Sequence, residues 1–350
     1  MNLLRWLLFP LALLYGSITW VRNFLYNRGV LKSQGFDVPI ISIGNLSMGG
    51  SGKSPMTEYL VRLLSSQKNI GIVSRGYGRK TKGVREVTEK SAASEVGDEP
   101  LQFKSKFTEV PVWVSEQRIE GIQVLLKSNP KTNLILLDDA FQHRQVTPKI
   151  AVLLMEYKDV LQGQYPFPMG RLREWMSGIR RADLVVITKC PNTVGEEEQN
   201  RLRMRLGLSN DSKLYFSSIE YGLIQAVHAG LSPIALNTEL SVLVVTGIAN
   251  PEPFLQHIRA QAKDVRSIRF KDHHSFTKSD LESIRMAYDT MPGKQKIVLC
   301  TEKDYMRIKD KALMLHTEKL PLYYLPIETV LQSNLKGSFD EEIKALLTHS

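Results

Sequence analysis

A glycine-rich segment near the start of the chain carries residues of the types and spacing that bind phosphate. In "SIGNLSMGGSGKSP", residues 42–55, Gly52-Lys53-Ser54 follow a glycine-rich turn and precede an amphipathic helix pattern. In a loop of the form GxxxxGK[ST], backbone N–H groups surround the phosphates, the lysine reaches the outer phosphates, and the hydroxyl binds Mg²⁺. We therefore expect a nucleotide-binding loop made of Ser47, Met48, Gly49, Gly50, Ser51, Gly52, Lys53 and Ser54.

This loop departs from the pattern at one position. Ser47 stands where the first glycine belongs, although Gly49 and Gly50 supply backbone freedom inside the loop. The context favours phosphate binding, because the loop follows a buried-strand pattern and opens a helix. Pro55 suits the first helical turn, where its missing N–H has no cost. The simpler alternative is a glycine-rich turn with a serine that caps the helix.

A pair of adjacent carboxylates follows a second apolar run. "NLILLDDAFQHR" places Asp138 and Asp139 directly after four apolar residues, as in a Walker B strand. Adjacent residues on a strand point to opposite sides, so one carboxylate can bind metal while the other does a different task. We expect Asp138 and Ser54 to hold Mg²⁺ beside Lys53. For either aspartate alone, a helix N-cap is the alternative.

The order of apolar runs predicts the elements that position these residues. Continuous runs alternate with helix patterns at 55–66 and 116–128, which favours a parallel sheet covered on both faces. The fold class is therefore α/β, a doubly wound, mostly parallel sheet like that of P-loop NTPases. A long polar loop is expected at 77–100. The predicted strands are 38–45, 69–76, 110–115, 132–139, 149–156 and 182–190.

Weaker strand signals at 214–240 suggest a connection or a small β ribbon before a second lobe. A strand, turn and helix restart at 241–258, with Pro251 near the helix start, and 296–308 reads as a last strand–helix unit. We divide the chain into an N-terminal membrane-associating helix, a P-loop domain and a smaller C-terminal α/β lobe, at 1–32, 33–229 and 230–350.

Composition restricts the class of partner. The formal charge of +10 and the pI of about 9.4 favour anionic partners: nucleic acid, acidic lipid or phosphorylated substrates. No RRM, zinc-finger or clear helix-turn-helix pattern supports nucleic acid, so we expect none. Cys190 and Cys300 lack CxxC neighbours, which predicts reduced thiols and neither a zinc site nor a disulfide framework.

The first residues are unusually apolar. Trp6–Val21 carries no charge, lies between Arg5 and Arg22, and is shorter than the roughly 20 residues that span a bilayer. It contains interface-favouring aromatics and is followed by basic residues, which indicates a helix lying in or partly inserted into a membrane surface. A buried core helix and a true span remain the alternatives.

Six motifs in this order resemble one enzyme family. They are "GNLSMGGSGKSP", "SRGYGR", "VGDEP", "LDDAFQHR", "GRLRE" and "DHHSF". Together they resemble the tetraacyldisaccharide 4′-kinases, the lipid A 4′-kinases of Gram-negative bacteria. The resemblance implies a membrane-associated P-loop kinase. With the N-terminal helix and the positive charge, we expect a monomer at the anionic cytoplasmic face of the inner membrane. Its cofactors would be ATP and Mg²⁺. It would phosphorylate the 4′-hydroxyl of an acylated glucosamine disaccharide 1-phosphate, forming the 1,4′-bisphosphate (lipid IVA).

The chain departs from the usual family pattern at a few positions. Ser54 stands where threonine is common, and Ala140 stands where glycine usually follows the two aspartates. Met169 and Arg171 stand where alanine and proline are more frequent. The hydroxyl at 54 is kept, whereas the other changes bear on the acceptor contacts around residues 172–174.

The resemblance also implies roles for residues that generic patterns do not single out. It points to Asp98 of "VGDEP" as the base for the acceptor hydroxyl, with His273 of "DHHSF" in support and His274 as the alternative histidine. Asp139 could share that role, and Glu99 could assist the metal. The remaining candidates for binding the lipid substrate are Arg75, Tyr77, Gln142, His143, Arg173 and Glu174.

Two further expectations follow. The two lobes would close over ATP and acceptor, as in many kinases. The rival function is a P-loop GTPase or ATPase switch, or a metallochaperone, which would hydrolyse nucleotide without a lipid acceptor and would not need the N-terminal helix.

Overall fold

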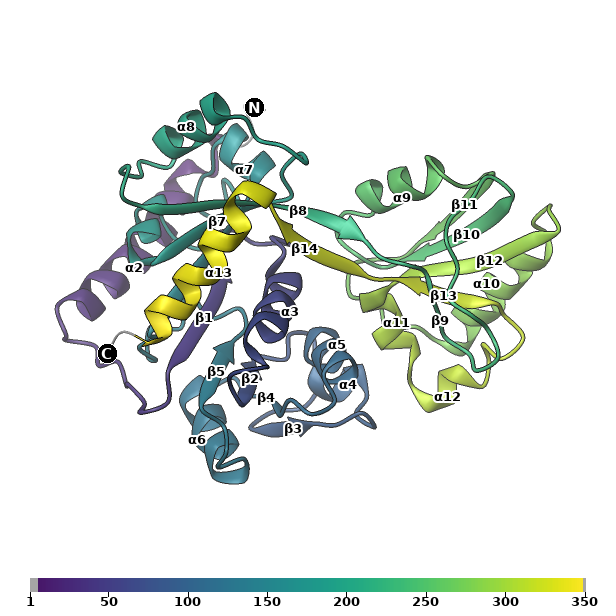
Figure 1. The fold of residues 1–350 in the computed structure, drawn as a ribbon, viewed down its shortest axis with the longest axis horizontal. Coiled ribbons are helices and arrows are strands. Elements are labelled where there is room, and N and C mark those ends of the chain that lie inside the picture. Colours follow the sequence, from purple (N-terminus) through teal and green to yellow (C-terminus); the bar gives the residue numbers. More distant parts are fainter. Residues whose placement is uncertain (1–5, 349–350) are drawn as a thin grey trace. The chain divides into compact units, whose positions relative to one another are not determined.

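A computed structural model describes residues 6–348 and divides the chain into two compact units. The first unit comprises 1–75, 110–220 and 329–350, and the second comprises 76–109 and 221–328. This division differs from the linear ranges expected above, because the segment 76–109 belongs to the second unit and the C-terminus returns to the first. Figure 1 shows the elements of both units along the chain.

The first unit is built on a mostly parallel sheet with strand order β14-β8-β7-β6-β1-β5-β2-β4. β1 lies between β5 and β6 and pairs in parallel with both. Every residue of β1 is buried, which explains why it reads as a continuous apolar run. The predicted α/β class is confirmed. The strands are β1 (Ile40–Asn45), β2 (Ile70–Ser74), β4 (Val112–Val114), β5 (Leu134–Leu137), β6 (Ile150–Glu156), β7 (Leu184–Thr188), β8 (Lys213–Tyr221) and β14 (Ile327–Leu331).

Helices of the first unit come from both ends of the chain. The C-terminal helix α13, yellow in Figure 1, packs its Phe339 ring edge-on against Tyr215 of β8. The sequence patterns gave no indication of this last helix. The helices are α2 (Phe9–Asn27), α3 (Lys53–Leu64), α6 (Arg118–Ser128), α7 (Tyr157–Gln162), the 3₁₀ helix η1 (Met176–Arg181), α8 (Glu196–Arg205) and α13 (Ser333–Thr348).

The N-terminal helix α2 is held to the first unit by one face. Gly16 is buried against the indole of Trp175, and a Cβ at Gly16 would lie 2.6 Å from that ring. Other positions of α2 and the residues just before it are apolar and exposed. Among residues 6–348, none of the helices has the length and apolar character needed to cross a bilayer. The exposed apolar side chains here are Trp6, Leu7, Phe9, Leu11, Leu13, Leu14, Ile18, Trp20, Val21 and Phe24.

The second unit has its own sheet, with order β11-β10-β12-β13-β9. Strand β10, which lies between β11 and β12, is buried on both faces: Val242 and Val244 join one apolar cluster, and Leu243 and Val245 join another. All pairs are parallel except β13 with β9. The strands are β9 (Gln225–Ala226), β10 (Leu240–Thr246), β11 (Asp264–Arg269), β12 (Gln295–Thr301) and β13 (Leu322–Leu325). The helices are α9 (Glu252–Arg259), α10 (Lys278–Asp289), α11 (Glu302–Ile308) and α12 (Lys311–Met314).

The segment expected as a long polar loop, 77–100, contains regular structure. It includes the short strand β3 (Arg85–Val87) and helix α4 (Ala93–Val96), and it ends in the first turn of α5 (Asp98–Lys106). Asp98 is therefore the first residue of a helix and is buried, not an acid in a solvated loop. The region 214–240 also differs from expectation, because its first part is the continuous strand β8.

Candidate active site

The predicted phosphate-binding loop connects β1 to α3. Gly49 and Gly52 have φ of 118° and 82°, values that side chains disfavour, so glycine is required at both positions. Gly52 lies at the N-cap of α3, so the first N–H groups of the helix face the loop. Ser47, at the first glycine position, is buried and donates its hydroxyl to Asp159 Oδ2 at 3.2 Å. A serine can thus replace the first glycine of the pattern, because its side chain is buried and hydrogen-bonded to Asp159.

Lys53 extends back along the loop toward Asp139. Its Nζ lies 3.8 Å from Asp139 Oδ1 and 3.4 Å from the Gly49 carbonyl. Arg173 donates hydrogen bonds from both terminal nitrogens to the same carboxylate, at 2.8 and 3.2 Å. Burial raises the pKa of Asp139, but the charges of Lys53 and Arg173 outweigh it and hold that pKa below its ordinary value. The structure therefore brings together two predicted catalytic residues and one predicted substrate-binding residue.

Asp138, at the end of β5, is fully buried and accepts a hydrogen bond from Ser74 Oγ at 2.9 Å. Within residues 6–348, no three histidine, cysteine or carboxylate side chains gather as a metal-binding group. Mg²⁺ at nucleotides needs only one or two protein oxygens, with phosphates and water completing its shell. Ser54 lies in the first turn of α3, which follows β1, and Asp138 directly follows β5, the parallel neighbour of β1. The hydroxyl of Ser54 and the carboxylate of Asp138 are hard oxygen donors, so this donor set fits Mg²⁺.

Gln142 and Glu174, which were predicted to bind substrate, form hydrogen bonds with other residues of the protein. Gln142 Nε2 donates to the Asn45 carbonyl at 2.8 Å and to Glu174 Oε1 at 3.0 Å. Glu174 is buried and receives both terminal nitrogens of Arg181 at 2.8 Å. Asn23 of α2 donates to the same carboxylate at 2.6 Å. This network links the end of β1, the segment after β5 and the N-terminal helix.

His143 lines a hollow of about 330 Å³ in the first unit, together with Ala140, Phe141, Arg144 and Arg181. Burial lowers the pKa of His143 to about 4, and neighbouring arginines contribute, so the imidazole is neutral at pH 7. Arg75 directly follows strand β2, and its side chain is exposed. The hollow is therefore lined by a neutral imidazole and by the guanidinium groups of Arg144 and Arg181.

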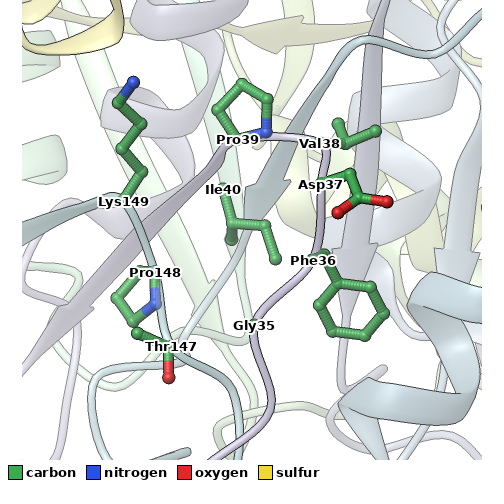
Figure 2. A pocket seen from close by; sticks show the side chains of 9 residues that line it. All are labelled: Gly35, Phe36, Asp37, Val38, Pro39, Ile40, Thr147, Pro148 and Lys149. Carbon is green, nitrogen blue, oxygen red and sulfur yellow. The ribbon is translucent and has the colours of Figure 1, made fainter. Parts of the chain in front are cut away.

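A second hollow, of about 280 Å³, lies elsewhere in the first unit. Figure 2 shows it beside Pro39 and Ile40, where β1 begins, with Lys149 and its neighbours facing them. Ligands of open parallel sheets bind at the carboxyl ends of the strands. This hollow lies at the amino end of β1, whereas the phosphate-binding loop follows its carboxyl end, so we do not assign the site to it.

In the second unit, Asp98 is surrounded by cations. Arg307 of α11 donates Nε to Asp98 Oδ2 at 3.0 Å and also contacts it through Nη2. His273 Nδ1 lies 3.4 Å from the same oxygen. Burial raises the pKa of Asp98, but the hydrogen bond from His273 and the charge of Arg307 outweigh it, so that pKa is well below its ordinary value. The bond to Asp98 conversely raises the pKa of His273.

The two candidate histidines have different surroundings. His273 has a φ of 54°, an uncommon conformation outside glycine, and its ring meets that of exposed Tyr77 edge-on. His274 instead stacks on Phe270 and lies 3.0 Å from Asp280 at the start of α10. The geometry therefore assigns the contact with Asp98 to His273.

Two residues that sequence reasoning did not single out complete this cluster. Arg307 donates Nη1 to the Gly247 carbonyl at 2.8 Å and to Asp304 Oδ1 at 3.0 Å. Asp304 is fully buried and accepts the Gly247 N–H at 3.0 Å. The sequence contains one indication of this pair: Asp304 and Arg307 carry opposite charges three residues apart in the amphipathic segment "TEKDYMRI". Glu99 of α5, predicted as a metal ligand, forms an ion pair with Lys303 of α11.

The predicted candidates thus fall into two groups. The loop residues, Asp138, Asp139, Arg75, Gln142, His143, Arg173 and Glu174 belong to the first unit, and Tyr77, Asp98, Glu99 and His273 belong to the second. A glycine-rich loop between a central parallel strand and a helix, next to carboxylates of a neighbouring strand, is the nucleotide-phosphate site of P-loop α/β proteins. The fold and the loop place the chain in that class.

Comparison with known proteins defines the family. The profile of the tetraacyldisaccharide-1-P 4′-kinases matches residues 4–346, and the chain belongs to this family. It is an enzyme of lipid A biosynthesis, a kinase acting at the 4′ position of a tetraacyldisaccharide. Membership favours this activity over the nucleotide-switch alternative. Cys190 and Cys300 are free and buried.

Individual relatives agree over nearly the whole chain. The tetraacyldisaccharide 4′-kinase of Flavobacterium johnsoniae is 44% identical over 344 residues, covering 98% of this chain and 97% of its own. That of Bacteroides thetaiotaomicron is 38% identical, covering 97% and 92%. A crystal structure of LpxK from Aquifex aeolicus in complex with ATP is 28% identical, with a TM-score of 0.76, and covers 99% of this chain and 100% of that one.

Proposed function

We propose that the loop of residues 47–54 binds the phosphates of ATP and that the γ-phosphate passes to the 4′-hydroxyl of a lipid-linked disaccharide 1-phosphate. The observation that carries this proposal is the close grouping of Lys53, Asp139 and Arg173 at the loop. The Aquifex relative, which was crystallised with ATP, supports the choice of nucleotide. Ser54 and Asp138 would hold Mg²⁺, which neutralises phosphate charge when bound.

The base in this proposal is Asp98. The 4′-oxygen forms a bond to the γ-phosphorus while the bond from that phosphorus to the bridging oxygen of ADP breaks. The electron pair stays on ADP, and the hydroxyl proton passes to Asp98. His273 contacts the Asp98 carboxylate and sets its basicity. Because phosphoryl transfer depends on positioning and charge, these roles need no covalent intermediate.

The N-terminal helix would hold the enzyme at the cytoplasmic surface of the inner membrane. Its exposed apolar residues and aromatics suit the interfacial region of a bilayer, and the net charge of +10 favours anionic lipid. The opposite face of α2 contacts two residues that are candidates for binding the lipid substrate: Tyr15 donates to the Arg173 carbonyl at 3.0 Å, and Asn23 donates to the Glu174 carboxylate. The helix therefore connects the membrane surface to residues proposed to handle the lipid headgroup.

Transfer of labelled γ-phosphate from ATP to purified tetraacyldisaccharide 1-phosphate in detergent tests the chemistry. We expect Asp98→Asn to lower kcat by roughly 10²–10⁴-fold, the usual contribution of a general base. The matched control is Asp289→Asn, an exposed aspartate at the end of α10 in the same unit. Equal kcat values for the two variants would remove Asp98 from the proposed role, while the loop assignment would stand.

Membrane docking is tested separately by changing exposed positions only. Leu14 and Ile18 are each 60% exposed, so their replacement by glutamate leaves the inner face of α2 intact. We expect the double variant to lose binding to vesicles containing phosphatidylglycerol, while kcat on detergent-dispersed substrate stays within about twofold of wild type. Met204→Glu, an exposed apolar position on α8, is the control. Unchanged vesicle binding by the double variant would refute docking through α2.

A further inference from the structure

The segment containing Arg171 is fastened directly to the phosphate-binding loop. The Arg171 carbonyl accepts the Met48 N–H at 2.7 Å, and the Arg173 N–H donates to the Leu46 carbonyl at 2.7 Å. Ser47 and Leu172 form an antiparallel bridge between these hydrogen bonds. The backbone at Arg171 is therefore fixed in register against the part of the loop that would surround phosphate.

The Arg171 side chain lies over Gly49. A Cβ added at Gly49 would collide with Arg171 Nη2 and would lie 3.1 Å from its Cζ. The positive φ of Gly49 and the adjacent guanidinium together require the absence of a side chain at this position. The loop thus has a cation directly over its backbone, in addition to Lys53 and Arg173.

Among residues 6–348, this cation has no counter-ion. Across the part of the chain that the structure describes, residues 6–348, the exposed guanidinium of Arg171 forms no salt bridge and donates no hydrogen bond. Arg173, two residues later, is by contrast committed to Asp139. A guanidinium offers several N–H donors in a planar fork that matches phosphate oxygens. An unpaired arginine fixed beside a phosphate-binding loop is positioned for a phosphate ligand.

We propose that Arg171 is a further ligand of the terminal phosphate of the bound nucleoside triphosphate and stabilises it during transfer. This inference rests on the proposed binding of ATP to the loop. As the oxygen bridging the β- and γ-phosphates takes up the electron pair, charge redistributes over the transferred group and ADP. Guanidinium donors stabilise this distribution, and arginines in such positions contribute strongly to kcat in other P-loop enzymes.

The test compares four variants of the full-length enzyme: Arg171→Ala, Arg171→Lys, Lys53→Ala and the control Arg180→Ala. Arg180 is an exposed arginine of η1 in the same unit. The affinities for ATP and ADP are measured by calorimetry, kcat is measured by lipid phosphorylation, and thermal melting checks the fold. For Arg171→Ala we expect ATP affinity to fall roughly tenfold to a hundredfold, the range of one charge-assisted hydrogen bond. ADP affinity should stay within about twofold.

The lysine variant separates charge from geometry. Because lysine keeps the charge but not the fork, Arg171→Lys should recover part of the ATP affinity while kcat stays low. The inference would be overturned if Arg171→Ala had the same ATP affinity and kcat as Arg180→Ala. It would also be overturned if Arg171→Ala lost ATP affinity and ADP affinity to the same extent. Lys53→Ala reports on the loop itself: if that variant keeps normal ATP affinity, the loop assignment fails and not merely the role of Arg171.

Discussion

Replacing Arg307 by methionine should destabilise the second unit selectively. The Arg307 side chain is 7% exposed and is hydrogen-bonded to two buried carboxylates, Asp98 and Asp304, and to the Gly247 carbonyl. Methionine fills similar space but leaves both carboxylates without their main counter-ion. Breaking a buried ion pair by removing one partner costs about 3–5 kcal/mol. We expect a loss of this size in the free energy of unfolding of the second unit.

Hydrogen exchange gives the sharpest measurement, because it reports each unit separately. At 1.4 kcal/mol per tenfold, the expected loss speeds exchange of β10 and β12 amides by roughly 10²- to 10³-fold or slightly more. Amides of β1 and β6 in the first unit serve as the internal reference. Arg285→Met is the matched control, since Arg285 pairs with Asp289 on the exposed surface of α10 at 3.9 Å. Such pairs contribute only about 0–1 kcal/mol.

The pH dependence of the Arg307→Met effect follows from the sign of the Asp98 shift. The folded-state pKa of Asp98 is depressed, so its stabilising contribution is present above the ordinary value of 3.8 and is lost as the pH falls toward the folded value. Without Arg307 the depression is smaller. The stability gap between wild type and Arg307→Met should therefore narrow as the pH falls below about 4. Exchange of β10 amides no faster than in Arg285→Met, or a gap that widens in acid, would refute the reasoning.

Two further predictions concern catalysis and the N-terminal helix. Because the pKa of His273 is raised above 6.5 by Asp98, protonated His273 weakens the base, so kcat/KM should rise with pH through an apparent pKa above 6.5. His273→Gln should lack this limb, and an identical profile in the variant would contradict the assignment. Gly16→Leu should force α2 away from Trp175 and lower lipid-kinase kcat/KM about tenfold or more, through displacement of the acceptor side. The control is Ser17→Leu, at an exposed position of the same helix. Equal activity of the two variants would show that the packing of α2 on Trp175 does not affect the acceptor side.

The architecture of the first unit was largely predictable, because its strands are buried on both faces. Every residue of β1 and β5 is buried, and β6 has a single partly exposed residue, so each strand can be recognised from a continuous run without an alternating pattern. The loop followed from Gly52, Lys53 and Ser54 at fixed spacing. The helix α13 was missed, since its identity as a first-unit element depends on contacts of Phe339 with residues more than a hundred positions earlier.

The environment of Asp98 shows what local patterns cannot supply. Its neighbours in sequence are polar, which predicted a solvated loop, yet its main partner Arg307 lies 209 residues later. A buried carboxylate is stable only with counter-charges, and no local signal states which distant residues provide them. The motif "VGDEP" located Asp98 only through the family resemblance. The motif says nothing of Arg307 and Asp304, whose opposite charges on one turn of α11 would be read as a solvated pair. Because burial reverses that interpretation, the residues that tune a proposed base become visible only when the second unit is assembled from both of its chain segments, 76–109 and 221–328.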